Sequence, residues 1–309
     1  MKKNSLIFVA GHKGLVGSSI VNELKNKGYN DLILKTSGEL DLRDQSMSAD
    51  FFNEKRPEYV FLAAARVGGI GANNKFRARM IYDNLMIQTN VIHNAYISGV
   101  KKLLFLGSSC IYPKFAPQPI KEEYLLTSEL EYTNEPYAVA KIAGLKMIEA
   151  YNAEYGTDFI SVMPTNLYGE NDNFDLETGH VLPVMIRKFH DAKTEGKKYV
   201  DLWGTGTPRR EFMYSGDLAK AVVKLMNEVS NSKTHINIGT GVDVTIKELA
   251  ELIKGITGFA GEIRWNADMP DGTPRKLLDI TKIKDLGWAP EMSLKDGIIK
   301  VYEWYKNNK

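Results

Sequence analysis

The feature that most constrains this chain is a repeated alternation of short apolar runs with longer amphipathic stretches. SLIFVA (5–10) precedes a helical pattern over 15–27, and LILK (32–35) precedes another over 46–55. YVFLAAA (59–65), LLFLG (103–107) and DFISVMP (158–164) continue the series, separated by helical patterns over 81–99 and 136–155. Because the expected strands are apolar throughout, both faces of their sheet must be covered. The order predicts an α/β fold, a doubly wound parallel sheet of the Rossmann type.

The texture changes near residue 168, where NLYGENDNFDLETGH is polar and rich in turn formers. Beyond it, VDLW (200–203) and EIRW (262–265) are expected strands, and 245–254 and 293–306 are expected helices. We therefore expect a smaller C-terminal α/β lobe over the carboxyl ends of the main strands. The predicted division is a dinucleotide-binding domain over 1–168 and 210–238, and a substrate-binding domain over 169–209 and 239–309.

Composition excludes several classes of partner. Forty basic and 38 acidic residues among 309 give a net charge of +2, so no overall field favours nucleic acid or an anionic membrane. No apolar run reaches 18 residues, and the N-terminal stretch lacks the features of a signal peptide. A single cysteine excludes an internal disulfide. We expect a cytoplasmic protein with no membrane, nucleic-acid or metal partner.

The first expected strand leads into GHKGLVG, in which Gly11, Gly14 and Gly17 are spaced as in a dinucleotide fingerprint. The first glycine permits a tight turn, the second lets the backbone approach a pyrophosphate, and the third lets the helix pack on the sheet. The N–H groups at the start of that helix then bind the anion. A plain strand–helix turn is the weaker interpretation.

The second expected strand ends in LILKTSGELDL, without an acidic residue directly after it. NAD-binding sites place a carboxylate there to accept from the ribose 2′-OH. Lys13 and Lys35 would instead lie near a 2′-phosphate, which favours NADP(H) over NAD. The alternative is that both lysines are solvated surface charges. Asp41 is expected near the adenine.

NEPYAVAK places Tyr137 and Lys141 four residues apart, on one face of the expected helix. A neighbouring ammonium would lower the phenol pKa from about 10 and make Tyr137 a usable proton donor. GSSCIYPK follows the strand LLFLG, so Ser108 and Cys110 are expected at the carboxyl edge of the sheet, where open α/β sheets bind ligands. Ser108 would donate to a substrate carbonyl beside Tyr137.

These motifs resemble the extended short-chain dehydrogenase/reductases, and within them the branch that epimerises and reduces GDP-4-keto-6-deoxymannose. The matching stretches include GHKGLVGSSI, AAARVGGI, GSSCIYPK, NEPYAVAKIAG, SVMPTNLYG, WGTGTPRREF and PDGTPRKLLD, and they span most of the chain. The resemblance implies NADPH-dependent reduction of the C4 ketone of a GDP-4-keto-6-deoxy sugar. It also implies preceding epimerisation at C3 and C5, and a homodimer formed by the helices over 81–99 and around Tyr137.

The resemblance also implies roles for individual residues. Ser108, Tyr137 and Lys141 would form the reductase triad, and Cys110 and His180 the epimerisation acid–base pair. A catalytic Cys110 would need its pKa lowered from about 8.5. Implied cofactor contacts are Gly11, Lys13, Gly14, Leu15, Val16, Gly17, Lys35, Asp41, Leu42, Ala64, Lys141, Pro164, Asn166, Leu167 and His180. Implied substrate contacts are Lys188, Trp203, Arg210, Asp271 and Lys276, with the two basic residues Lys188 and Arg210 facing the diphosphate. Trp203 either stacks on the base or fills the core of the smaller lobe.

The match loosens in NNKFRARM (73–80), at Glu170 and just before His180, and at Arg209 and Ser215–Gly216. These departures leave the sugar open between a hexose and a heptose. They also leave open a reductase with silent epimerase residues. A nucleotide-sugar 4-epimerase or 4,6-dehydratase is a further alternative, and a non-catalytic NADP-binding protein is a less favoured one because Tyr137 and Lys141 are both present.

Overall fold

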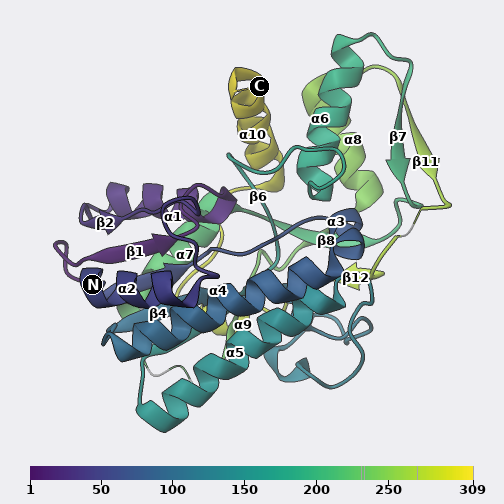
Figure 1. Ribbon diagram of the computed structural model, residues 1–309. Helices are drawn as coiled ribbons and strands as arrows, with labels where there is room; N and C mark the ends of the chain where they lie inside the picture. The colour runs from purple at the N-terminus through teal and green to yellow at the C-terminus, as the bar shows by residue number, and fades with distance from the viewer. Residues whose placement is uncertain (231, 233, 270, 309) are drawn as a thin grey trace.

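The computed structural model describes residues 1–230, 232, 234–269 and 271–308. Its main sheet has six parallel strands (Figure 1). In spatial order they are β2 (Leu32–Ile33), β1 (Ile7–Ala10), β3 (Tyr59–Leu62), β4 (Lys102–Leu106), β5 (Phe159–Pro164) and β9 (Ile236–Ile238). β1, β4 and β5 are buried along their whole length, as continuously apolar strands require. The predicted fold class is confirmed.

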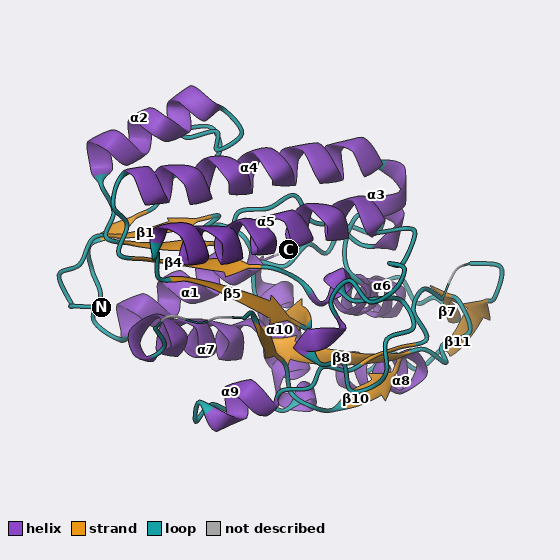
Figure 2. Cartoon of the chain, turned by 90° about the horizontal axis from the view of Figure 1, so that it is seen from below, coloured by secondary structure: helices purple, strands orange, loops and turns teal. Residues whose placement is uncertain are grey.

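Helices cover both faces of this sheet (Figure 2). On one face lie α2 (Gln45–Lys55), α4 (Arg77–Ile97) and α5 (Glu135–Tyr155), and on the other lie α1 (Leu15–Asn26) and α7 (Ser215–Glu228). Strand order reverses between β1, which leads to β2 on one side, and β3, which continues to β4 and β5 on the other. Ligands of open α/β sheets bind at such a reversal, outside the carboxyl ends of the strands.

The smaller lobe has its own hydrophobic core. It contains α6 (Val181–Thr194), α8 (Ile246–Thr257), α10 (Leu294–Asn308) and the parallel pair β7 (Tyr199–Trp203) and β11 (Glu262–Asn266). The expected strands at 200–203 and 262–265 and the expected helices at 245–254 and 293–306 are confirmed. α6 and α7 were not predicted from the sequence.

A small central sheet connects the two parts. Its middle strand β8 (Arg209–Tyr214) pairs with β6 (Asn166–Tyr168), β10 (Asp243–Thr245) and β12 (Arg275–Lys276). The remaining helices are α3 (Ile70–Lys75), α9 (Thr281–Asp285) and two short 3₁₀ turns, Ser109–Ile111 and Glu122–Tyr124. Leu278, Ile280 and Ile283 pack into the larger core, although they fall in the range 239–309 assigned to the smaller domain.

In the described part of the chain, the helices are all too short or too polar to cross a bilayer.

Candidate active site

A cleft of about 1000 Å³ lies between the carboxyl edge of the main sheet and the smaller lobe. Every site residue predicted from the sequence lies on its wall, although the predicted contacts come from segments up to 265 positions apart, from Gly11 to Lys276. The fold therefore brings the glycine loop, the Ser108 loop, the start of α5 and the expected substrate residues to one space. The role of each residue stays a prediction.

The glycine loop between β1 and α1 fits a dinucleotide. Gly11 has φ +84°, and a Cβ there would lie 2.7 Å from the Ala64 backbone nitrogen. A Cβ on Gly17 would lie 2.1 Å from the Gly11 carbonyl oxygen, so only glycine lets α1 pack this closely. A Cβ on Gly14 would meet only that oxygen, at 3.5 Å, and no side chain caps the helix that Gly14 begins. The first N–H groups of α1 are thus left for an anion.

The end of β2 holds more charge than expected. Glu39 accepts hydrogen bonds from the Thr36 backbone N–H (2.8 Å) and hydroxyl (2.7 Å), which lower its pKa to about 2, and it lies 3.4 Å from Lys35. Arg43 also lines the cleft, where it donates to both oxygens of Asp41 at 2.7–3.2 Å. Arg43 is a third cation at this end of the cleft. Its position in ELDLRD was the available signal.

The predicted reductase residues converge at the end of β4. Ser108 caps the 3₁₀ turn Ser109–Ile111, and a hydrogen bond joins its side chain to Tyr137. Tyr137 and Lys141 lie in the first two turns of α5. Lys141 is 3% exposed, and its Nζ donates to the Leu106 carbonyl (2.9 Å) and lies 5.8 Å from the Tyr137 ring centroid.

The expectation that Lys141 lowers the Tyr137 pKa is wrong for the protein alone. Burial raises the Tyr137 pKa, nearby Cys110 adds to the rise, and the Ser108 hydrogen bond opposes it. Burial also lowers the Lys141 pKa to about 8. Desolvation is the main cause of both shifts. Tyr137 is therefore protonated in the protein alone.

Cys110 and His180 face the same cleft from opposite parts of the molecule. Cys110 is buried, and its N–H donates to Ser108 Oγ (3.3 Å). The expectation of a lowered thiol pKa is wrong here: burial raises it, although Lys276, Ser108 and Lys141 oppose the rise. His180 directly precedes α6 and is exposed to the cleft. Desolvation by the surrounding chain nevertheless lowers its pKa, and the charge of Lys276 lowers it further. Both groups start neutral.

The expected substrate residues line the far end of the cleft. Arg210 donates to the Arg209 (2.8 Å) and Asp271 (3.3 Å) carbonyls, and burial lowers its pKa to about 10. Lys276 on β12 lies opposite Arg210 in the backbone register with β8. Lys188 donates to the Asp201 carbonyl at 2.8 Å. These three cations suit a dianionic diphosphate.

Two further expected contacts have distinct surroundings. The Asp271 carboxylate accepts from the Thr205 backbone N–H and hydroxyl, both at 2.8 Å. Trp203 is 49% exposed, which excludes the interpretation that it fills the core of the smaller lobe.

The acidic residues of the cleft wall that sequence reasoning missed include Glu131 and Asp172. Glu131 is buried and accepts from the backbone N–H groups of Thr133 (3.1 Å) and Asn134 (3.2 Å), just before α5. Burial raises the pKa of Asp172 to about 7. Nothing in the spacing of either residue distinguishes it from an ordinary loop carboxylate.

The departures from the family pattern separate into two groups. Glu170 accepts from the Tyr214 hydroxyl (2.8 and 2.9 Å), Arg209 pairs with Asp243 (2.9 Å), and Ser215 Oγ lies 2.8 Å from Ser19 Oγ. Over the described residues, the cleft wall includes none of Glu170, Arg209, Ser215 and Gly216, but it does include Asn73, Leu176 and Glu177. Among the departures, those that line the cleft and so could affect which sugar binds are therefore Asn73 and the residues just before His180.

The comparisons with known proteins agree with the geometry. Residues 7–239 match the model of the NAD dependent epimerase/dehydratase family. The chain is 58% identical to GDP-L-fucose synthase 1 of Arabidopsis thaliana, over 99% of this chain and 94% of the relative. It is similar to the crystal structure of a GDP-6-OMe-4-keto-L-xylo-heptose reductase from C. jejuni (TM-score 0.96, 45% identity, 100% and 99% of the two chains covered). It is also similar to MlghC, a GDP-mannoheptose C4 reductase from Campylobacter jejuni with NADP bound (TM-score 0.92, 48% identity, 99% of each chain covered).

The parallel sheet carries a phosphate cradle that needs glycine at positions 11 and 17, and Tyr137 and Lys141 lie beside Ser108. Since the matches also cover nearly the whole length, the chain belongs to the NAD dependent epimerase/dehydratase family, among the extended short-chain dehydrogenase/reductases.

Proposed function

We propose that this protein is an NADPH-dependent reductase of the C4 ketone in a GDP-4-keto-6-deoxy sugar, able to epimerise C3 and C5 beforehand. The observation that carries the proposal is the presence of Ser108, Tyr137, Lys141, Cys110 and His180 on the wall of one cleft with the phosphate cradle. The relatives named above support it, since one is a GDP-L-fucose synthase and two reduce GDP-heptoses. The sugar is a hexose or a related heptose.

The cradle fits the cofactor. The N-terminus of α1 would hold the pyrophosphate, and Lys13, Lys35 and Arg43 would surround a 2′-phosphate. Lys141 would hold the nicotinamide ribose from the floor of the cleft. When bound, NADPH supplies a hydride to C4 of the sugar. The NADP-bound relative MlghC supports the choice of cofactor.

The reduction then depends on proton delivery by this chain's own residues. Ser108 donates a hydrogen bond to the C4 oxygen and orients the ketone against Tyr137. Tyr137 delivers its proton to that oxygen as negative charge develops there, so that the product is an alcohol and not an alkoxide. Lys188 and Arg210 bind the diphosphate and so fix the distance of the sugar from Tyr137.

Epimerisation would use Cys110 and His180. The C4 ketone acidifies the hydrogens at C3 and C5, so a base on one face and an acid on the other can invert either carbon. Burial favours the thiol, so Cys110 would first pass its proton to neutral His180, which leaves the thiolate as the base and the imidazolium as the acid. Lys276 is placed to favour the thiolate, because its charge lowers the Cys110 pKa.

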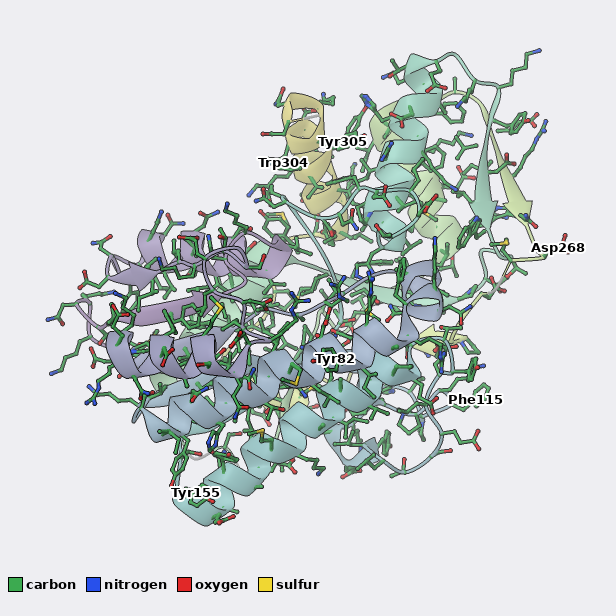
Figure 3. All side chains as sticks on the ribbon, viewed as in Figure 1. Tyr82, Phe115, Tyr155, Asp268, Trp304 and Tyr305 are labelled. Atoms are coloured by element: carbon green, nitrogen blue, oxygen red, sulfur yellow. The ribbon has the colours of Figure 1, made fainter. Side chains whose placement is uncertain are left out.

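We also propose a homodimer through α4 and α5. On these helices Tyr82 (62%), Ile97 (59%), Val139 (41%) and Tyr155 (46%) are exposed, and Figure 3 places Tyr82 on α4 and Tyr155 at the end of α5. Exposed large apolar side chains on two neighbouring helices are consistent with an interface there. A cytoplasmic location is proposed because the activity needs Cys110 reduced. We keep the division into a cofactor domain (1–168, 210–238) and a substrate domain (169–209, 239–309) as part of the proposal.

The test combines purified protein, NADPH and GDP-4-keto-6-deoxymannose or its heptose counterpart, with NADPH absorbance followed over time. Tyr137→Phe should reduce kcat by about 10²–10⁴-fold, while Tyr199→Phe, exposed on β7 and away from the cleft wall, should not. Wild-type protein that consumes no NADPH with any GDP-4-keto sugar refutes the proposal. Turnover of a nucleotide sugar by tightly bound oxidised cofactor, without added reductant, would instead support the 4-epimerase or dehydratase alternative.

A further inference from the structure

Tyr112 ends the loop that carries Ser108 and Cys110, and its hydroxyl group is buried in a polar network. The side chain is 3% exposed, and the hydroxyl lies 2.5 Å from Asn237 Oδ1 and 2.9 Å from His235 Nε2. Asn237 is fully buried and His235 is 5% exposed. Neither partner lines the cleft, so the network lies behind the catalytic loop.

The direction of these hydrogen bonds follows from the neighbours. The Asn237 side-chain amide donates from Nδ2 to the Ile120 carbonyl (3.0 Å), so its Oδ1 faces Tyr112. The single hydroxyl proton of Tyr112 therefore goes to Asn237, and His235 Nε2–H donates to the Tyr112 oxygen. Burial, with Lys282 and Lys146 nearby, lowers the His235 pKa to about 4, which keeps the imidazole neutral. A neutral ring with its proton on Nε2 satisfies Tyr112 at both positions.

This network fixes one end of the catalytic loop. At the other end, the Gly107 N–H donates to the Val162 carbonyl (2.8 Å), and the Ser108 side chain is hydrogen-bonded to Tyr137. Cys110 lies between these attachments in a single 3₁₀ turn. On the Tyr112 side the loop is held by the hydrogen bond to Asn237, which lies in β9, the edge strand of the main sheet.

We propose that Tyr112 is a positioning residue that holds Cys110 in the orientation needed for epimerisation. The inference rests on the proposed function for its catalytic part. Ser108 keeps its own attachments to the end of β4 and to Tyr137 when Tyr112 is altered. Loss of the Tyr112 hydroxyl therefore disturbs Cys110 more than Ser108, and epimerisation more than reduction.

Cys110 is the only cysteine in the chain, so alkylation of the protein reports on this residue alone. Tyr112→Phe should raise the iodoacetamide labelling rate by at least about tenfold, since loss of even one buried hydrogen bond shifts a local opening equilibrium by about that factor and this variant loses two. Tyr29→Phe is the matched control. Tyr29 is 4% exposed and donates to Asn227 Oδ1 (3.1 Å), in the same core but at the opposite end of the sheet. Its labelling rate should equal that of the wild type.

The second readout is the number of deuterons incorporated at C3 and C5 per NADPH consumed in deuterated buffer. Tyr112→Phe should lower this ratio several-fold, and Tyr29→Phe should leave it unchanged. His235→Leu, which removes the other partner, should act in the same direction and replaces Tyr112→Phe if that variant does not fold. Equal labelling rates and equal ratios in the Tyr112 and Tyr29 variants would overturn the inference. Wild-type protein without NADPH consumption would refute the proposed function, while the labelling comparison would still decide whether Tyr112 holds Cys110.

Discussion

The ammonium group of Lys141 should lose its charge close to pH 8, and the loss should have opposite effects on activity and on stability. Lys141 is 3% exposed, its one hydrogen bond goes to the Leu106 carbonyl, and the Phe105 ring centroid lies 4.8 Å from Nζ. Burial lowers its pKa from 10.5 to about 8, with Cys110 as an opposing influence. At about 1.4 kcal/mol per pH unit, this shift corresponds to about 3 kcal/mol between the charged and neutral forms.

The sign follows from comparison with the unfolded chain. Below pH 8 the folded protein holds a buried charge that the unfolded chain would leave in water, and this destabilises the fold. Between pH 8 and 10.5 the folded lysine becomes neutral first, so the penalty is relieved as pH rises. Activity should fall over the same window, because a neutral amine would no longer hold the ribose.

Two pH series check the reasoning. Urea unfolding of wild type and Lys141→Met should show a difference in unfolding free energy that moves in favour of the wild type by up to about 3 kcal/mol from pH 8 to 10.5. Lys146→Met, on the same helix but exposed and paired with Glu149 at 2.7 Å, should show no such trend. In the activity series, kcat/KM should fall with an apparent pKa near 8. If the free-energy difference stays constant and activity stays flat to pH 10, then the Lys141 pKa is not lowered and its charge is not needed for activity.

Three further predictions concern the cradle, the epimerase pair and the central sheet. Gly17→Ala places a Cβ 2.1 Å from the Gly11 oxygen, so NADPH binding measured by fluorescence should weaken at least about tenfold, whereas Gly255→Ala, which meets open space, should not weaken it. Cys110→Ser should lower deuterium wash-in at C3 and C5 by about 10²-fold or more, and it should spare reduction of an already epimerised ketone; unchanged wash-in would remove Cys110 from the chemistry. Glu211 is fully buried and accepts from three backbone N–H groups, so Glu211→Gln should lower the unfolding free energy in urea by about 1–3 kcal/mol; a smaller loss would show that the amide is accommodated.

The regular parts of the fold could be predicted because each strand and helix carries its own period. Apolar strands at 5–10, 103–107 and 158–164 are recognisable without any neighbour, and so is the glycine loop that follows the first of them. α7 was missed although its apolar face is buried, because it follows β8 without a turn signal. The central sheet was missed because β6, β10 and β12 have only two or three residues each, too few to show a period.

The candidate site was predictable in its residue types and not in its electrostatics. The spacing of Tyr137 and Lys141 correctly places both on one face of α5, yet it says nothing of the depth at which they lie. Burial reverses the expected direction of the Tyr137 pKa shift and of the Cys110 shift. Arg43 and Glu131 also escaped notice, because only the fold brings Arg43 close to Asp83 and Glu131 close to Arg210 and Lys276.

The sequence by itself determined the parallel sheet, the phosphate cradle and the placement of Tyr137 and Lys141 on one helix face, since these depend on residues within one turn or one strand of each other. Only the tertiary structure decided that Lys276 faces Cys110 and His180, that Tyr112 is tied to β9, and that Glu170 and Ser215 lie away from the cleft. The physical reason is distance along the chain. Local conformation follows from neighbouring side chains, whereas charge, desolvation and shape at a site depend on which remote segments the fold packs together.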